Sequence, residues 1–218
     1  MLGVAEDHLD LERLTQAAPT REAARDFGAR LARTHGAGAA AYGAGPDRWE
    51  GDGFFGPLSE PLPMELGAWP TWGAFYAEAR VEPMARLARD RGVYDADDVR
   101  LLDALCDRLA RGELDTDDPP GRIHGDLWSG NVMWTPGGAT LIDPAAHGGH
   151  RETDLALLAL FGAPHLDGIR EGYQQVHRLA DGWERRVGVH QLHCLLVHAI
   201  LFGGGYPAQA LAAARPYV

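Results

Sequence analysis

Apolar residues near the start of the chain recur at helical spacing. Thr20 is a favourable N-cap residue, and Ala23, Phe27 and Leu31 follow it at intervals of four positions. Such spacing places these side chains on one face of a helix. We therefore predict a helix that runs to about His35, where the nearby glycines end it.

Two more apolar stripes follow a long loop, residues 36–70, that is rich in glycine and proline. The aromatic residues of this loop predict that it packs onto the domain. Thr71 is the next N-cap candidate, and the apolar face behind it consists of Trp72, Phe75, Tyr76 and Ala79. Asp95 opens a further helix, whose apolar positions are Val99, Leu102, Leu105, Cys106 and Leu109. The first half of the chain is thus predicted to be mainly helical.

The periodicity changes after the acidic linker of residues 115–120. Short extended segments are predicted at 122–124, 131–134 and 139–142, and the last two flank Pro136-Gly137-Gly138, which is typical of a hairpin turn. Helices are predicted again near 152–161, 166–178, 189–202 and 207–214. The predicted fold class is therefore mainly α (α+β), with one small β-hairpin in the middle of the chain.

Composition excludes several classes of protein. Hydrophobic residues make up 45% and charged residues 23% of the 218 positions, as in ordinary globular proteins. The longest nearly apolar run, residues 155–163, is about half of the roughly 18 residues that a membrane span needs. The N-terminus lacks the features of a secretory signal, so a cytoplasmic protein is expected. A formal net charge of −11 argues against a nucleic-acid partner. Cys106 and Cys194 lie in predicted helices and are expected to be reduced thiols.

The chemically informative stretch is Arg122-Ile-His-Gly-Asp-Leu-Trp-Ser-Gly-Asn131, followed after the hairpin by Leu141-Ile-Asp-Pro144. Kinases share this spacing: a His two before an Asp, an Asn five after it, and a second Asp behind an apolar strand. Asp126 can accept the proton of an attacking hydroxyl. Asn131 and Asp143 offer the oxygen ligands that Mg²⁺ prefers beside ATP. Each motif alone is typical of a simple turn, whereas the combination predicts phosphoryl transfer.

The same stretch resembles the fructosamine/ketosamine-3-kinase family, which is related to aminoglycoside phosphotransferases and choline kinases. The resemblance rests on the runs 124–131, Asp143-Pro-Ala145 and Gly149-His-Arg-Glu-Thr-Asp-Leu-Ala156, and extends over nearly the whole chain. It implies the large C-terminal lobe of a protein-kinase-like fold, with Asp126 as base, Asn131 and Asp143 on magnesium, and His124 and Asp154 supporting the catalytic loop. The substrates it implies are ketosamines on small amines or protein lysines, phosphorylated by ATP on a sugar hydroxyl.

Several aromatic side chains near these motifs have two interpretations each. The ring of Trp128 can stack on a sugar or serve as a packed anchor. His147 and His150 follow Asp143 closely, so they either contact a substrate or have no role in binding it. A metal site has also to be considered for His190, His193 and His198, yet no cysteine or carboxylate at ligand spacing completes a tetrahedral set. We expect these last three to be core or surface histidines.

Two elements of the kinase pattern have no counterpart here. All 20 positive residues are arginine, so no lysine can contact the nucleotide phosphates, and no glycine-rich strand-flanked loop precedes His124. We expect residues 1–14 to be a hinge remnant, with Glu6 and His8 at the adenine edge, and residues 15–218 to be the C-terminal lobe. The N-terminal lobe is expected to be absent, which predicts weak activity. An aminoglycoside- or choline-type kinase and a non-enzymatic binding domain remain alternatives.

An isolated large lobe exposes the apolar face that would meet a small lobe, which predicts self-association of this chain through that face. Sedimentation velocity over a range of protein concentrations measures this directly. A strictly monomeric profile at high concentration would contradict the prediction.

Overall fold

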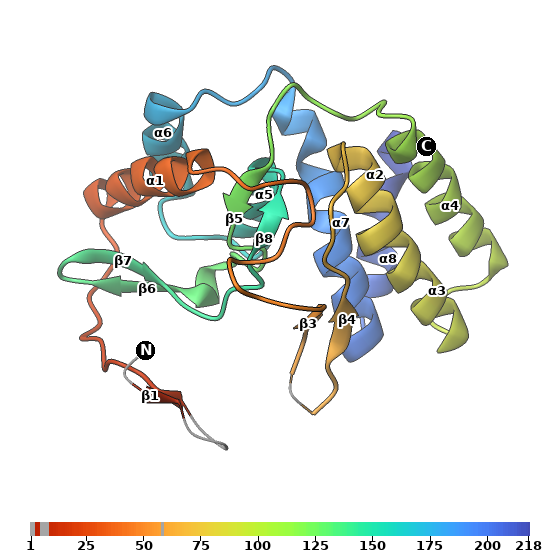
Figure 1. The fold of residues 1–218 in the computed structure, drawn as a ribbon, viewed down its shortest axis with the longest axis horizontal. Coiled ribbons are helices and arrows are strands. Elements are labelled where there is room, and N and C mark those ends of the chain that lie inside the picture. Colours follow the sequence, from red (N-terminus) through yellow and green to blue (C-terminus); the bar gives the residue numbers. More distant parts are fainter. Residues whose placement is uncertain (1–2, 5–8, 58) are drawn as a thin grey trace.

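The computed structural model describes residues 3–4, 9–57 and 59–218 (Figure 1). Strands β1 (Gly3–Val4) and β2 (Leu9–Asp10) form a short antiparallel pair that precedes helix α1 (Arg21–Gly36). Thr20 caps α1, because its Oγ1 accepts the backbone N–H of Ala23 at 3.1 Å. The predicted first helix is confirmed at both ends, since it starts after Thr20 and ends at Gly36.

The long loop after α1 packs onto the domain at Tyr42, whereas Trp49 and Phe54 of the same loop are exposed, so its aromatic content predicted the packing only in part. Tyr42 is buried and forms an isolated antiparallel bridge with Trp69. The loop also contains an unpredicted strand pair, β3 (Gly53–Phe55) and β4 (Leu62–Met64). Strands of three residues carry too few alternating positions to give a period-2 signal.

A long helical rod follows, built from α2 (Trp72–Tyr76), a π-helical turn η1 (Ala77–Val81) and α3 (Glu82–Asp90). The predicted apolar face is confirmed, since all four of its residues are buried. Helix α4 (Ala96–Ala110) starts at a capping box in which Asp95 accepts the backbone N–H groups of Asp97 and Asp98. The π-helical turn was not predicted, and turns of this kind often mark functional sites.

The middle of the chain contains four short strands and one turn of 3₁₀ helix. Strand β5 (Gly121–Ile123) pairs with β8 (His147–Gly149), and η2 (Ser129–Asn131) leads into the hairpin of β6 (Val132–Thr135) and β7 (Gly138–Leu141). The predicted hairpin is confirmed to within one residue at each strand end. The β5–β8 pair was missed, because its partners lie far apart in the sequence.

Four helices complete the chain: α5 (Glu152–Leu160), α6 (Leu166–Val176), α7 (Trp183–Phe202) and α8 (Tyr206–Ala214), followed by a 3₁₀ turn, η3 (Arg215–Tyr217). Helix α7 begins six residues before the predicted start. Its first turns include Glu184, Arg185 and Arg186 and lack apolar periodicity, so the pattern becomes visible only at Val189. The prediction of a mainly helical fold is confirmed.

The helices enclose two hydrophobic cores. The larger lies between α2, α3, α4, α7 and α8, and the second lies between α1, α5, α6 and the β6–β7 hairpin (Figure 1). Leu127, from the loop after β5, is fully buried in the second core. That anchor fixes the loop which carries the predicted catalytic residues.

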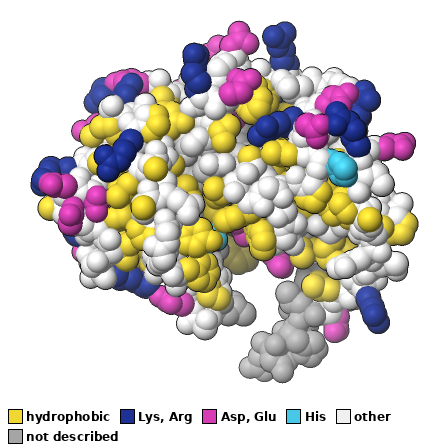
Figure 2. Space-filling model, turned by 180° about the vertical axis from the view of Figure 1, so that it is seen from behind, with side chains coloured by type: hydrophobic (Ala, Val, Ile, Leu, Met, Phe, Trp, Pro, Cys, Tyr) yellow, Lys and Arg dark blue, Asp and Glu magenta, His cyan; other side chains and the backbone are white. Residues whose placement is uncertain are grey.

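The surface agrees with the expectations from composition. On the face drawn in Figure 2, hydrophobic side chains gather toward the middle, while basic and acidic side chains lie beside one another around the margin.

None of the helices in the described residues has the length and apolarity that a membrane span requires. Cys106 and Cys194 are free thiols, as predicted.

Helices α1 and α6 touch backbone to backbone at two glycines. A Cβ on Gly28 would overlap the carbonyl oxygen of Ile169, and one on Gly172 would overlap the carbonyl oxygen of Arg25. The two helices pack over much of their length at this separation. Only a residue without a side chain permits it.

Gly28→Ala should therefore destabilise the protein by about 1–3 kcal/mol, because the helices must separate to admit the methyl group. Urea unfolding measures this change. Gly137→Ala is the control: the nearest side-chain atom to its Cβ would be Thr135 Oγ1 at 3.7 Å, so a change within about 0.5 kcal/mol is expected. Equal stability of both variants would refute the close packing.

Candidate active site

The loop after β5 turns sharply at a glycine that accepts no substitute. Gly125 has φ of +84°, and a Cβ there would overlap the carbonyl oxygen of Ala145. Asp126 follows directly and lines a cavity beside the loop. The turn thus presents the predicted catalytic carboxylate while Leu127 anchors the chain below it.

Asp154, from the first turn of α5, holds this loop by its backbone. Its Oδ2 accepts the N–H of His124 at 2.8 Å, and its Oδ1 accepts the N–H of Gly125 at 3.0 Å. The carboxylate is completely buried. It therefore holds the two residues immediately before Asp126.

A third donor to Asp154 comes from α1, and the motifs did not reveal it. His35 Nε2 lies 3.0 Å from Asp154 Oδ2, while the Tyr173 hydroxyl on α6 lies 2.8 Å from His35 Nδ1. His35 is in the last turn of its helix, where a histidine is ordinarily taken as a favourable charge at the C-terminus. Nothing in the local sequence indicates its partner.

His124 and Asn131 connect Asp126 to the segment that carries Asp143. His124 Nε2 donates to the carbonyl oxygen of Ile142 at 2.9 Å, and its Nδ1 accepts the N–H of Asp126 at 3.3 Å. Asn131 Nδ2 donates to the carbonyl oxygen of Asp126 at 2.8 Å and to Asp126 Oδ2 at 3.2 Å. In return, Ile142 N–H donates to the Asn131 carbonyl oxygen at 3.1 Å. Asp126, Asn131 and the residue just before Asp143 are therefore in one hydrogen-bonded unit.

Two side-chain oxygens of this unit, on Asn131 and Asp143, have no hydrogen-bond partner within the described part of the chain. Asn131 is buried with its amide nitrogen engaged by Asp126, so its Oδ1 is left as an acceptor. Asp143 is exposed and adopts a left-handed conformation with φ of +51°, which aspartate tolerates better than most residues. A carboxylate and an amide oxygen are the hard ligands that suit Mg²⁺.

The pKa values of the two important carboxylates shift in opposite directions, although both groups are buried. Burial raises the pKa of Asp126 above its usual value, and the nearby His124 and the Asn131 hydrogen bond only partly oppose this. Burial also acts to raise the pKa of Asp154, but the hydrogen bond from His35 and the neighbouring donors outweigh it and hold that pKa below its usual value. Asp126 is thus a stronger base than an exposed aspartate, whereas Asp154 stays ionised.

A cavity of about 230 Å³ opens beside Asp126, between the catalytic loop, α7 and the turn after β3. Trp128 is 39% exposed at its mouth and meets Phe161 edge to face, with ring centroids 5.9 Å apart. His198 and Phe202, from the end of α7, also line it. Aromatic rings with one carboxylate among them suit a small polar ligand with apolar faces.

Comparisons with known proteins agree with this geometry. The family model described as fructosamine kinase matches residues 3–216. The chain belongs to the fructosamine kinase family. A crystal structure from Thermobifida fusca, assigned by its name to fructosamine-3-kinase, is 50% identical, with a TM-score of 0.85 over 94% of this chain and 67% of that one. A Haemophilus somnus structure, 20% identical with a TM-score of 0.76, shares the fold.

The curated relatives match this fructosamine kinase family member over a smaller part of its length than the Thermobifida fusca structure does. A Klebsiella aerogenes protein described as a "Probable ketoamine kinase" is 38% identical over 61% of this chain and 45% of its own length. A Synechocystis protein of the same description is 33% identical over 84% of this chain and 58% of its own length. The chain spans about half the length of the curated relatives it matches.

The two histidines expected near a substrate lie deeper than the sequence suggests. His150 is 1% exposed, and its ring nitrogens lie 2.8 Å from Thr116 Oγ1 and 3.2 Å from the backbone N of Glu152. His147 is also buried, and its Nδ1 donates to the Ala145 carbonyl oxygen at 2.7 Å. Neither lines the cavity beside Asp126, because strand β8 and the turn after it point them into the interior. Glu6 and His8, expected at the nucleotide, lie outside the described residues.

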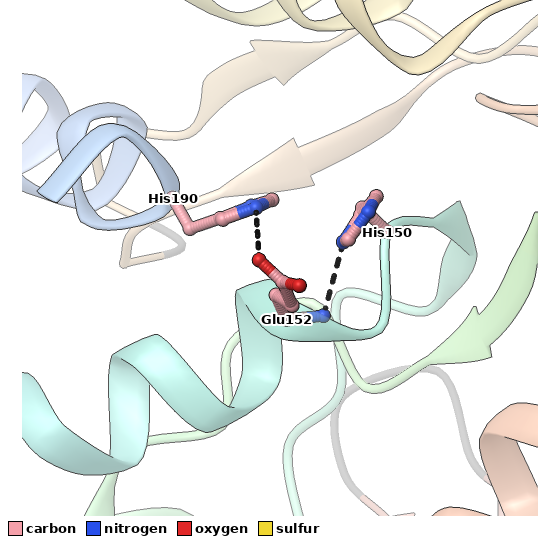
Figure 3. Close-up of side chains that lie close together, drawn as sticks. All are labelled: His150, Glu152 and His190. Atoms are coloured by element: carbon pink, nitrogen blue, oxygen red, sulfur yellow. Dashed lines mark hydrogen bonds and ion pairs between the residues drawn. The ribbon is translucent and has the colours of Figure 1, made fainter. Parts of the chain in front are cut away.

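One buried cluster has the composition of a metal site, namely His150, Glu152 and His190 (Figure 3). Arg186 already binds Glu152 through both carboxylate oxygens, at 2.6 and 2.9 Å. The two imidazoles stack on each other with centroids 4.7 Å apart. A cation here would be repelled by the Arg186 guanidinium, so this cluster is a paired structural network.

The other histidines considered for a metal are dispersed by the fold. His193 packs on Phe55, with ring centroids 4.6 Å apart. His198 packs among Phe161, Phe202 and Tyr206. The interpretation of these residues as packed histidines is therefore favoured over a shared metal site.

Asp154→Asn should destabilise this family member by about 2–4 kcal/mol at pH 7, because a neutral amide replaces the buried carboxylate that accepts from His35 and from two backbone N–H groups. A depressed pKa stabilises the fold above the unfolded-state value of about 3.9, and this contribution is lost as pH falls through the folded-state pKa. The stability difference between wild type and variant should therefore narrow from pH 7 to pH 3 in urea unfolding.

The control for this experiment is Asp167→Asn. Asp167 pairs with Arg21 at the surface, where its side chain is 67% exposed. Loss of this surface ion pair should leave the free energy of unfolding nearly unchanged at every pH. A stability difference for Asp154→Asn that stays constant across the pH range would contradict the role assigned to its charge.

Proposed function

We propose that this chain carries the catalytic residues of an ATP-dependent phosphotransferase that phosphorylates a sugar hydroxyl of ketosamines. The observation that carries the proposal is the contact between Asn131 and Asp126, together with the link through Ile142 to Asp143. A base and two metal-ligand oxygens in one hydrogen-bonded unit are what phosphoryl transfer requires. Membership of the fructosamine kinase family supports the same conclusion.

Asp126 is proposed as the general base. Asn131 engages its Oδ2, which leaves Oδ1 to accept the proton of a substrate hydroxyl as that oxygen attacks the terminal phosphate. The raised pKa of Asp126 supports this role, because a stronger base takes the proton more readily. The hydrogen bond from the backbone N–H of Asp126 to His124 Nδ1 stabilises the conformation of the loop that carries this base.

Asn131 Oδ1 and the Asp143 carboxylate are proposed to hold Mg²⁺. Both are hard oxygen donors, and no ion pair occupies Asp143 among the described residues. Bound magnesium would neutralise phosphate charge and orient the nucleotide. The fit is chemically consistent, since the amide nitrogen of Asn131 is committed to Asp126 and its oxygen is not.

The aromatic cavity is proposed to accept the sugar. The exposed ring of Trp128 offers a flat apolar face, and Asp126 lies at the same cavity for the hydroxyl to be phosphorylated. The sugar to be phosphorylated is borne by a small amine or by a protein lysine. A panel that also includes aminoglycosides and choline separates the proposed substrate from those of the related kinases.

We also propose that residues 15–218 correspond to a kinase-like C-terminal lobe and that these 218 residues alone have weak activity. The chain has no lysine to contact the nucleotide phosphates, and electrostatic stabilisation of the transferred group is a large part of catalysis. The activity of a binding-only domain would be zero, whereas a weak kinase retains magnesium-dependent turnover.

Asp126→Asn should reduce kcat for fructosyl-lysine phosphorylation by about 10²–10⁴-fold with magnesium–ATP binding retained, because only the base is lost. Asp143→Asn should instead weaken magnesium-dependent ATP binding. Phosphate-transfer assays and isothermal titration calorimetry on the same preparations measure the two effects. In wild type the acid limb of the pH–rate profile should lie above the usual aspartate range, because the base is active only when deprotonated.

Asp90→Asn, an exposed carboxylate at the end of α3, is the matched control and should leave both measurements unchanged. Calorimetry also separates the alternative of a non-enzymatic domain. Absence of magnesium-dependent ATP binding in wild type, or an unchanged rate in Asp126→Asn, would overturn the proposed roles.

A further inference from the structure

A second cavity lies behind the catalytic loop and contains a single formal charge. Its volume is about 30 Å³, and it shares four lining residues with the larger cavity beside Asp126: Phe55, Gly125, His193 and Cys194. Sites for drug-sized ligands measure roughly 300–1,000 Å³, so a sugar is too large for it. A single water needs about 10–15 Å³, which leaves room for a small ion.

The charge is that of Arg80, in the π-helical turn η1. Arg80 is 2% exposed, and its guanidinium lies over Phe75 and Phe55, with Cζ 4.5 and 5.7 Å from the two ring centroids. Its Nη1 donates to the carbonyl oxygens of Glu65 and Ala79. Nε and Nη2 are buried and have no acceptor among the described residues.

No carboxylate balances this guanidinium. Within the described part of the chain, the lining of the cavity contains no Asp or Glu, and Arg80 forms no ion pair. Asp52 and Glu65 act on it only from a distance. A buried charge without a partner is costly, and donors held in a cavity without an acceptor add to that cost.

Arg80 nevertheless stays charged at neutral pH. Burial lowers its pKa to about 9, which is still well above 7. The neighbouring histidines are neutral, because burial lowers the pKa of His147 to about 3 and that of His193 well below its usual value. Burial also lowers the pKa of His150 and His190, the other two histidines of the lining, so the cavity is net positive.

We propose that this cavity binds one small monovalent anion of chloride size, held by Nε and Nη2 of Arg80. Two N–H groups on adjacent nitrogens of a guanidinium form a fork that suits a single acceptor or a short anion. The π-helical turn is an independent indication, since such turns are frequent at functional sites. The anion would join the α2–η1–α3 rod to the wall of the catalytic cavity at Gly125.

The site predicts chloride-dependent stability of the 218-residue chain. Melting temperature is measured at constant ionic strength while sodium gluconate is replaced by sodium chloride. A saturable rise of about 2–4 °C is expected once chloride exceeds its dissociation constant several-fold, because the ion binds the folded state alone. The same titration is repeated with sodium formate. A melting temperature that rises with formate but not with chloride would overturn the assignment of the site to a halide.

Arg80→Met removes the charge but keeps the length of the side chain, so the chloride dependence should vanish. Arg170→Met is the matched control. Arg170 also has a buried Nε without an acceptor and lies over an aromatic ring, that of Trp183 at 5.1 Å, but it does not line the cavity. Its variant should keep the full response to chloride.

Bromide replaces chloride in a diffraction experiment that does not depend on the variants folding. An anomalous peak within hydrogen-bond distance of the Arg80 guanidinium is expected in crystals of the wild-type chain grown with sodium bromide. Absence of that peak, or an equal chloride response in Arg80→Met, would overturn the proposal. Both readouts are independent of kinase activity, so their failure leaves the proposed phosphotransfer untouched.

Discussion

The buried carboxylate of Asp154 is the interaction on which the rest of the site depends. It is completely inaccessible to solvent and must be compensated by donors, which come from His35 on α1 and from two consecutive backbone N–H groups of the catalytic loop. A charge in this position selects one conformation of the loop, because any other would leave the carboxylate unpaired. The position of Asp126 follows from that selection.

One of the two hydrophobic cores holds the catalytic loop, and the other shapes the cavity. The second core fixes the loop through Leu127, while α7 of the larger core supplies the cavity wall that contains His198. The long α7 also presents His190 to the buried network of Glu152 and Arg186. Reactive groups therefore lie on a loop, and rigid helices position them from both sides.

Arginine is the only strong cation of this chain, and its buried and half-buried examples show what a guanidinium requires. Arg186 binds Glu152 through two hydrogen bonds, and Arg151 binds Asp118 at 2.8 Å. In both arrangements a carboxylate balances the charge of the guanidinium. Arg80 differs from them, because its acceptors among the described residues are all backbone carbonyls and it lies next to a cavity. This contrast is the reason for proposing an anion as the partner of Arg80.

The sequence by itself determined the local features. The caps at Thr20, Thr71 and Asp95, the helical periodicities and the β6–β7 hairpin depend on neighbours within a few positions, so their signals are local. The spacing of His124, Asp126 and Asn131 likewise belongs to a single loop. The tertiary structure alone decided which distant groups meet: His35 with Asp154, β5 with β8, and an interior position for His150. These contacts depend on the packing of separate elements, which residue spacing along the chain does not encode.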